Sequence, residues 1–231
     1  MVVGPVPVNE PRTEESKGTK EEEEHEGQKV LSQIMFNSKS AAAPPCKGRQ
    51  EHLAPGDSPE KYPILLKNRD FRKILSAFYT PAKPIELGGR LFATAEHIHH
   101  WQKFQRLNPK FAVLFEYGSG SVFARNPVLA KAAGGKRGVV KVDKKVVYKR
   151  PSDVKLDPQW QSNASQLKQQ YLDVKFEQDP LSRSILLATR NARLVHWTRG
   201  MKTSAVETEM MRVRAKLVGS SESRAASGSN V

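Results

Sequence analysis

Ionisable side chains gather between residues 94 and 104, in a segment whose sequence favours a helix. At about 100° per residue, one stripe of that helix carries a carboxylate, two imidazoles and an amine: Glu96, His99, His100 and Lys103. Two interpretations are open. The stripe is either a solvated face held by i to i+4 pairs, or a site in which a base, a proton carrier and a cation act together.

The start of this helix is indicated by Thr94, a residue type that caps helix N-termini. His97 takes the place that Glu or Gln would hold in a capping box, and Glu96 lies in the first turn, where the helix dipole favours a carboxylate. Histidines spaced i, i+2 and i+3 converge poorly on one ion, so we predict no metal. The single cysteine, Cys46, excludes an internal disulfide and a cysteine-based zinc site.

Further elements must position this helix. Strands or buried runs are expected at residues 30–36, 85–92 (a hairpin across Gly88 and Gly89), 139–148 (a turn at Asp143 and Lys144) and 192–197. Helices are expected at residues 68–75, 109–117, 127–133, 158–178, after Pro180, and beyond a capping box formed by Ser204 and Glu207. These elements predict one predominantly helical α+β domain with a few short strands.

Composition divides the 231 residues into three parts. Residues 1–28 hold eight Glu against three Lys or Arg, with almost no large apolar side chain, so a disordered acidic tail is expected there. The domain is expected at residues 29–218, with a mobile loop insertion at about 40–59, and a loose Ser- and Gly-rich tail at 219–231. The whole chain carries a net charge of +14, and removing the acidic tail at −5 leaves +19 on the remainder.

A basic body of this kind attracts polyanions such as nucleic acid, phosphorylated metabolites or an anionic membrane surface. The alternative is that the excess of Lys and Arg only keeps the protein soluble. No RRM, zinc-finger or helix-turn-helix pattern accompanies the charge, so sequence-specific DNA recognition is not supported. Without a signal peptide or an apolar run of about 18 residues, we expect an intracellular, cytoplasmic protein with no membrane partner, a nuclear location being the alternative.

Several short motifs recur in order along the chain: Ile34-Met35-Phe36, Leu75-Ser76-Ala77-Phe78-Tyr79, Gly88-Gly89, Thr94-Ala95-Glu96-His97, Gln102-Lys103-Phe104, Asn126-Pro127 with Ala130, Trp160, Lys175-Phe176-Glu177-Gln178, and Leu186-Leu187-Ala188-Thr189. Together they resemble the NADAR family, named for its link to NAD and ADP-ribose chemistry, over residues 30–217. The segments at residues 132–136 and 193–200 resemble a branch found in large DNA viruses and some eukaryotes.

The resemblance implies a hydrolase that cleaves an N-glycosidic bond between ribose phosphate or ADP-ribose and a nucleobase or aminopyrimidine. Substrates attributed to the family are aminopyrimidine intermediates of the riboflavin pathway and ADP-ribose attached to guanine in nucleic acid. Such a bond breaks with positive charge building on the anomeric carbon, so we assign Glu96 to stabilise that charge and activate water. Lys103 would bind a phosphate or the ribose, or attack an opened sugar as an amine.

Substrate binding is assigned to six other residues: Tyr79, His100, Trp160, His196, Arg199 and Gly200. Tyr79 and Trp160 would stack on the base, although aromatic residues there also suit a core. Arg199 suits a phosphate, and Gly200 lets the backbone approach it. No cofactor is expected, and the oligomeric state is left open.

Three features depart from the family pattern. Ala77 replaces an Asn, His99 and His100 replace an aromatic residue and Gln, and a late Asp-x-x-Trp-Gly element is not found. The alternative function is therefore a catalytically inactive module that binds ADP-ribose or nucleic acid. A structural interaction protein is the third hypothesis.

Overall fold

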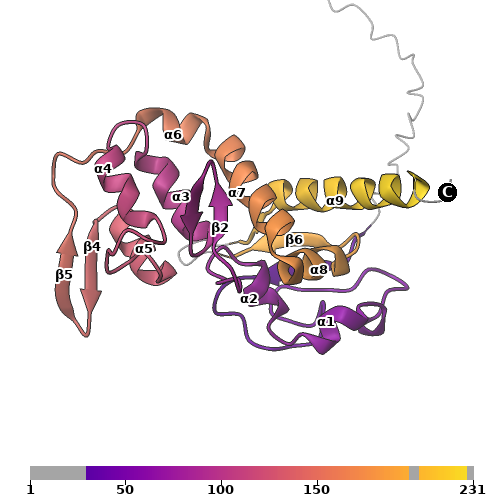
Figure 1. Cartoon of the computed structure of the whole chain (residues 1–231). Coiled ribbons are helices and arrows are strands. Elements are labelled where there is room, and N and C mark those ends of the chain that lie inside the picture. Colours follow the sequence, from indigo (N-terminus) through magenta and orange to yellow (C-terminus); the bar gives the residue numbers. More distant parts are fainter. Residues whose placement is uncertain (1–29, 198–202, 228–231) are drawn as a thin grey trace, which may run out of the picture.

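A three-stranded sheet joins the first strand of the chain to the last two. Strand β1 (Gln33–Phe36) pairs in parallel with β6 (Arg193–His196), and β6 pairs antiparallel with β7 (Ala205–Val206). Parallel strands need a long crossover connection, and the one between β1 and β6 contains most of the helices (Figure 1). This computed structural model describes residues 30–197 and 203–227, without the side chains of 221–227.

Helices in the described residues are α1 (Pro63–Lys67), α2 (Phe71–Leu75), α3 (Ala95–Phe104), α4 (Pro109–Ala112), α5 (Pro127–Gly134), α6 (Pro158–Ser162), α7 (Ala164–Gln178), α8 (Pro180–Ala188) and α9 (Thr208–Ser227), with short 3-10 turns at η1 (Pro59–Lys61) and η2 (Val113–Phe115). Many begin with proline, whose missing N–H costs nothing in the first turn. The side chains of Asn126, Asp157 and Asp179 then cap α5, α6 and α8 by accepting backbone N–H groups.

Two hairpins complete the α+β domain. One consists of β2 (Ile85–Leu87) and β3 (Arg90–Phe92), and the other of β4 (Val139–Val142) and β5 (Lys145–Lys149). Both turns use left-handed backbone, with positive φ at Gly88 and Gly89 in the first and at Asp143 and Lys144 in the second. Both hairpins were expected from the sequence, and the structure confirms them.

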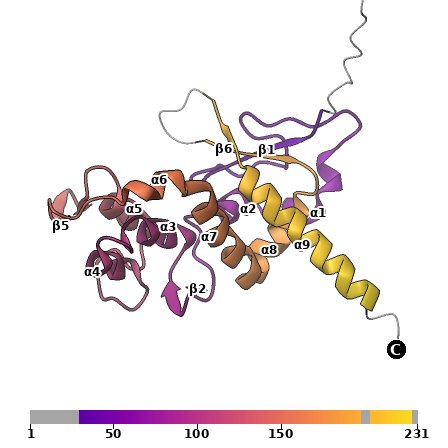
Figure 2. The same cartoon turned by 90° about the horizontal axis from the view of Figure 1, so that it is seen from above.

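Two apolar clusters lie on either side of α3. The larger cluster joins β1, β6, α2, α7, α8 and α9, and the smaller one packs Phe104, Phe111, Phe115 and Phe123 against α5 and β4. Trp101 on α3 contacts both clusters. Figures 1 and 2 both show α3 between α7 on one side and α4 and α5 on the other. Packing against both clusters therefore places α3, with its ionisable stripe, inside the domain.

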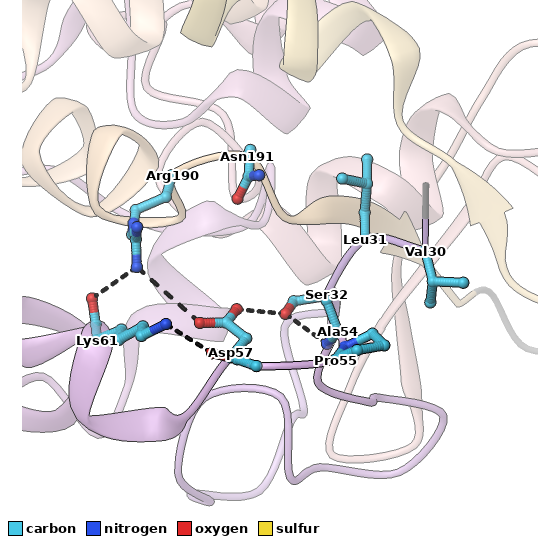
Figure 3. A pocket seen from close by; sticks show the side chains of 10 residues that line it. Val30, Leu31, Ser32, Ala54, Pro55, Asp57, Lys61, Arg190 and Asn191 are labelled. Carbon is cyan, nitrogen blue, oxygen red and sulfur yellow. Dashed lines mark hydrogen bonds and ion pairs between the residues drawn. The ribbon is translucent and has the colours of Figure 1, made fainter. Parts of the chain in front are cut away.

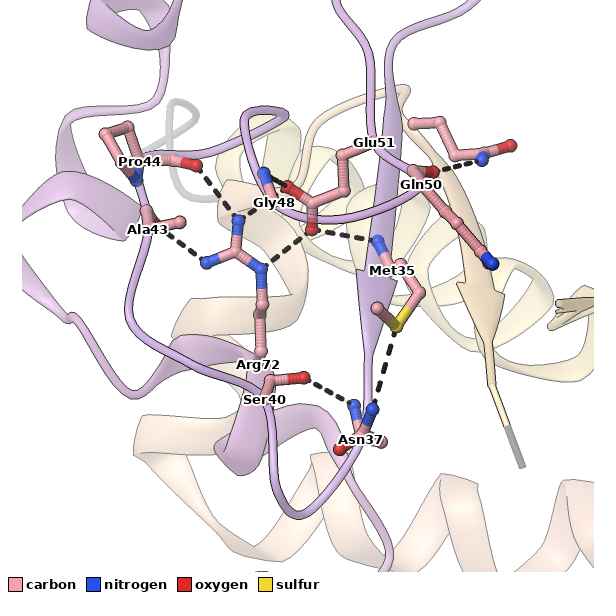
Figure 4. Close-up of polar contacts among 10 residues, drawn as sticks. Met35, Asn37, Ser40, Ala43, Pro44, Gly48, Gln50, Glu51 and Arg72 are labelled. Carbon is pink, nitrogen blue, oxygen red and sulfur yellow. Dashed lines mark hydrogen bonds and ion pairs between the residues drawn. The ribbon is translucent and has the colours of Figure 1, made fainter. Parts of the chain in front are cut away.

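The connection at residues 40–59 is held in place by one buried ion pair. The guanidinium of Arg72 on α2 donates to both carboxylate oxygens of Glu51, at 2.7 and 2.6 Å, and to the carbonyls of Ala43 and Pro44 (Figure 4). Glu51 also accepts the backbone N–H of Met35 on β1. These bonds tie the connection to a helix and a strand, and its expected mobility stays a prediction.

Two expectations about the later elements were wrong. The helix predicted over residues 158–178 is interrupted at Asn163, whose φ of −98° and ψ of 7° separate α6 from α7. The predicted capping box does not form, because Ser204 hydrogen-bonds Gln50 and the next residues pair with β6. Helix α9 continues to Ser227, and the looseness expected from residue 219 onward stays a prediction. The predicted acidic tail lies outside the described residues.

Candidate functional site

A cavity of about 400 Å³ opens where α3, α5, α7 and the start of α9 meet the carboxyl ends of β1 and β6. The residues that line it are Phe36, Ser38, Ser76, Ala77, Phe78, Glu96, His99, His100, Lys103, Lys131, Gly135, Lys168, Tyr171, His196, Glu207 and Met210. The ionisable stripe of α3 is thus a cavity wall. The interpretation as a solvated face is wrong, since Glu96 and His100 are 8% and 2% exposed.

Glu96 is held from two directions. Its backbone N–H donates to the carbonyl of Ala77 at 3.0 Å, and its Oε1 lies 3.1 Å from Nε2 of His100, one turn along α3. Burial, reinforced by the positive charges of Lys103 and Lys131, lowers the pKa of His100 well below its usual value. His100 is therefore neutral, with its proton on Nε2, and donates to the Glu96 carboxylate.

The position of His100 depends on a glycine of α5. A β-carbon built on Gly134 would lie only 2.2 Å from Nδ1 of His100, closer than any real contact. Nδ1 is buried and has no hydrogen-bond partner among the described residues. Gly134 therefore lets α5 approach α3 closely, and this approach confines the imidazole against Glu96.

Three amines line the same cavity from three helices. Lys103 is on α3, Lys131 on α5 and Lys168 on α7. Burial lowers the pKa of Lys103 to about 8, Glu96 opposes this shift and Lys131 adds to it. The Nζ of Lys103 lies 4.7 Å from the ring centroid of Trp160, a cation–π contact. A cavity with this many amines suits an anionic ligand.

A second carboxylate, Glu207, faces Glu96 from the segment between β7 and α9. Its Oε2 lies 2.6 Å from Nζ of Lys168, and its Oε1 lies 3.8 Å from Nδ1 of His196. His196 stacks on Phe36 with ring centroids 5.3 Å apart, and burial lowers its pKa. The backbone N–H of Glu207 donates to the carbonyl of Leu194 on β6, which fixes this carboxylate at the sheet edge.

The wall formed by residues 76–78 is held by Lys175. This side chain is 1% exposed, and its Nζ donates to the carbonyls of Ile74, Leu75 and Ser76 at 2.7, 3.0 and 2.7 Å. Burial lowers the pKa of Lys175 to about 7. The amine closes the C-terminal end of α2, whose carbonyls lack helical partners, and so sets the path of the chain into the cavity wall.

The two remaining histidines of α3 differ in position, because His99 also lines the cavity and His97 does not. His97 is fully buried, with Nδ1 2.8 Å from Oγ1 of Thr94 and Nε2 2.9 Å from the carbonyl of Phe123. This link replaces the capping box that the sequence left incomplete. His99 contacts the ring of Trp160, and burial lowers its pKa to about 3.

The structure brings four of the eight predicted site residues together around the cavity: Glu96, His100, Lys103 and His196. Tyr79 packs instead beside the larger apolar cluster, and Trp160 lies behind Lys103 without lining the cavity. Arg199 and Gly200 lie outside the described residues, so their assigned roles stay predictions.

Sequence analysis missed three charged residues of the cavity: Lys131, Lys168 and Glu207. Glu207 had been assigned to a capping box, and both lysines had been counted only in the overall charge. Tyr171 on α7, which was not predicted as a site residue, also borders the cavity. A single charged residue without a second polar residue at a regular spacing carries no local pattern that could have identified it.

A separate hollow of about 340 Å³ lies beside the start of β1 (Figure 3). Asp57 there accepts hydrogen bonds from Ser32 and from the hydroxyl of Tyr62, and Arg190 lies 4.0 Å away. Lys61 donates to the backbone carbonyl of Gly56. These polar groups satisfy one another, so the hollow has the bonding of a structural junction.

The described residues contain neither a membrane-spanning helix nor a metal-binding cluster. No helix there has both the length and the apolar character needed to cross a bilayer. No group of three or more His, Cys, Asp or Glu side chains in residues 30–197 and 203–227 is placed to hold a metal ion.

Similarity to known proteins is found among solved structures. No family model matches the chain, and no curated protein matches it. Among solved structures, the NMR structure of the Escherichia coli protein YbiA is similar, with a TM-score of 0.47 and 25% sequence identity. That similarity covers 65% of this chain and 80% of YbiA.

Proposed function

We propose that the protein is a hydrolase that cleaves the N-glycosidic bond between a nucleobase or aminopyrimidine and ribose phosphate or ADP-ribose. The observation that supports this most is Glu96, held by a neutral His100 in the same cavity as Lys103, Lys131 and Lys168. The carboxylate provides charge stabilisation and base catalysis, and the amines provide sites for phosphate. The sequence motifs that resemble the NADAR family point to the same chemistry.

The reaction would place the anomeric carbon of the ribose beside Glu96. As the C–N bond breaks, its electron pair leaves with the base nitrogen, and positive charge develops on the sugar, where the carboxylate stabilises it. Glu96 then accepts a proton from the attacking water, whose oxygen forms the new bond to the anomeric carbon, and the released base takes up one proton. His100 positions the carboxylate through its Nε2–H.

Lys103 has two alternative roles in this proposal, which differ in the protonation state of its amine. As an ammonium it would bind a phosphate or hydroxyl of the substrate. As a neutral amine, which its pKa of about 8 makes accessible near neutral pH, it would attack an opened sugar and form a Schiff base with loss of water. We favour the ammonium role, because Lys131 lines the same cavity and forms no ion pair with another described residue, so the two amines together suit a phosphate.

The decisive experiment is Glu96→Gln, assayed on ADP-ribosylated guanine in DNA and on the ribosylated aminopyrimidine, with products followed by mass spectrometry. We expect normal folding and a fall in kcat of about 10²-fold or more. The matched control is Glu116→Gln, because Glu116 pairs with Arg90 outside the cavity. Normal turnover by the Glu96 variant would exclude the role given to this carboxylate.

A binding module without turnover is the second candidate, and the amine-lined cavity favours it equally. It predicts that ADP-ribose raises the melting temperature of the wild type in a concentration-dependent way, with no product. A charge reversal at Lys131, which lines the cavity and is exposed, should abolish that stabilisation. Absence of stabilisation by any phosphorylated ribose would leave a structural interaction protein as the remaining hypothesis.

A further inference from the structure

The hairpin of β4 and β5 projects from one end of the molecule, opposite the end reached by α9, in both Figure 1 and Figure 2. Residues 136–149 contain six basic side chains and one acidic side chain. All six basic residues are exposed: Lys136, Arg137, Lys141, Lys144, Lys145 and Lys149. None of these six side chains forms an ion pair with another described residue, so their charge is directed to the surroundings.

A groove runs between this hairpin and α5. Arg137, Lys141 and Lys149 line it together with apolar side chains of α5 and of the two strands, and its volume is about 620 Å³. We call these three residues and the groove they line the basic groove. Its cations are spread from the base of the hairpin towards its tip, over a strand that rises about 3.3 Å per residue. A row of cations is complementary to a polymer that carries negative charges in a row.

Hydrogen bonds fix the base of the hairpin to the C-terminal end of α5, which lies beside the cavity. Arg150, at the base of the hairpin, donates to the carbonyls of Ala133 and Gly135 at 3.3 and 3.1 Å, and its guanidinium lies 5.2 Å from the ring centroid of Phe104. Gly135 and Lys131 line the cavity, whereas other residues of α5 line the basic groove. The two hollows are therefore separated by α5 itself, a helix about 10 Å across.

We propose that the basic groove and its hairpin form a docking surface for the phosphate backbone of a nucleic acid, which brings a modified nucleotide to the cavity. The contacts are to phosphate and carry no sequence information. The hairpin presents no exposed aromatic side chain for base stacking, because Tyr148 packs inward against Phe111 and Phe123. Delivery to the cavity rests on the proposed hydrolase function, whereas docking does not.

The test of docking uses unmodified oligonucleotides and fluorescence anisotropy. The triple variant Arg137→Ala, Lys141→Ala, Lys149→Ala should bind about tenfold or more weakly at low salt. The slope of log affinity against log salt should fall by about 2 to 3 for duplex DNA, since each lost phosphate contact removes about 0.9. Replacing Lys141 and Lys149 by Arg keeps the charge and should retain the affinity.

The control variant removes the same charges elsewhere. Lys47, Arg69 and Lys83 are exposed and lie outside the hairpin, so their replacement by Ala changes the net charge equally. Equal weakening by both triple variants would reduce the effect to net charge and overturn the proposal. A groove variant that keeps its DNA affinity would also overturn the proposal. The same holds if the variant keeps its DNA affinity and loses only its binding to phosphatidylserine vesicles, because the surface would then bind a membrane.

The test of delivery compares two substrates of the proposed reaction. The groove variant should lower kcat/KM for ADP-ribosylated guanine in an oligonucleotide and leave kcat/KM for the corresponding free nucleotide unchanged. An equal fall for both substrates would overturn delivery. Absence of turnover on either substrate in the wild type would contradict the hydrolase function, and the anisotropy result would still decide the docking surface.

Discussion

The buried Lys175 on α7 and the half-buried Lys103 on α3 have opposite surroundings. Burial lowers the pKa of both amines, to about 7 and about 8. The Nζ of Lys175 donates to three backbone carbonyls, whereas the Nζ of Lys103 has no hydrogen-bond partner in the described part of the chain and borders a cavity. A lowered pKa alone therefore does not identify a functional amine. The availability of that amine to a ligand distinguishes the two.

The largest expected effect separates the two lysines by stability. Lys175→Met removes the only side-chain donor to three buried carbonyls and should cost about 3 to 5 kcal/mol of unfolding free energy. Lys103→Met removes a desolvated charge and its cation–π contact with Trp160, but it leaves no hydrogen-bonded group unpaired, so its cost should stay within about 1 kcal/mol. Urea unfolding followed by circular dichroism measures both. Equal losses would show that Lys103 is also a structural amine.

An intermediate effect is expected from Gly134→Ala, which acts on the imidazole beside Lys103. The new methyl group would lie 2.2 Å from Nδ1 of His100 in the present packing, so α5 or His100 must move. We expect a loss of about 1 to 3 kcal/mol and a lower kcat, because His100 no longer positions Glu96. Gly118→Ala is the control, since nothing lies within 4 Å of the added carbon. Unchanged kcat in the Gly134 variant would remove His100 from the site.

The smallest expected effect is a pH dependence that assigns the role of Lys103. Its pKa is lowered from 10.5 to about 8, so the ammonium dominates below pH 8 and is lost above it. If the ammonium binds phosphate, kcat/KM falls as pH rises through about 8, by up to tenfold per unit. If the neutral amine attacks the sugar, kcat rises over the same interval.

Lys103→Arg sharpens this experiment, because a guanidinium stays charged and cannot act as an amine nucleophile at these pH values. Retained activity with the fall at pH 8 removed would support the ammonium role. Complete loss, together with a borohydride-trapped adduct on the wild-type chain, would support the amine.

Much of the local structure could be predicted from the chain. Proline after Asn or Asp marked the starts of α5, α6 and α8, and paired glycines marked the turn between β2 and β3. These features depend on backbone sterics and on contacts within one helical turn. The start of α9 was predicted too early, because it depends on a distant part of the chain. Residues 205 and 206 pair with β6, and this pairing overrides the local capping preference of Ser204.

The sequence by itself determined the α+β class, most element positions and the ionisable stripe of α3, since each depends on residues close together in the chain. Only the tertiary structure decided that this stripe is buried, that Gly134 confines His100, and that Lys131, Lys168 and Glu207 complete the cavity. These groups come from three separate elements, α5, α7 and the segment before α9, and no periodicity links them. Their meeting results from the packing of the two apolar clusters around α3, which depends on contacts between distant parts of the chain.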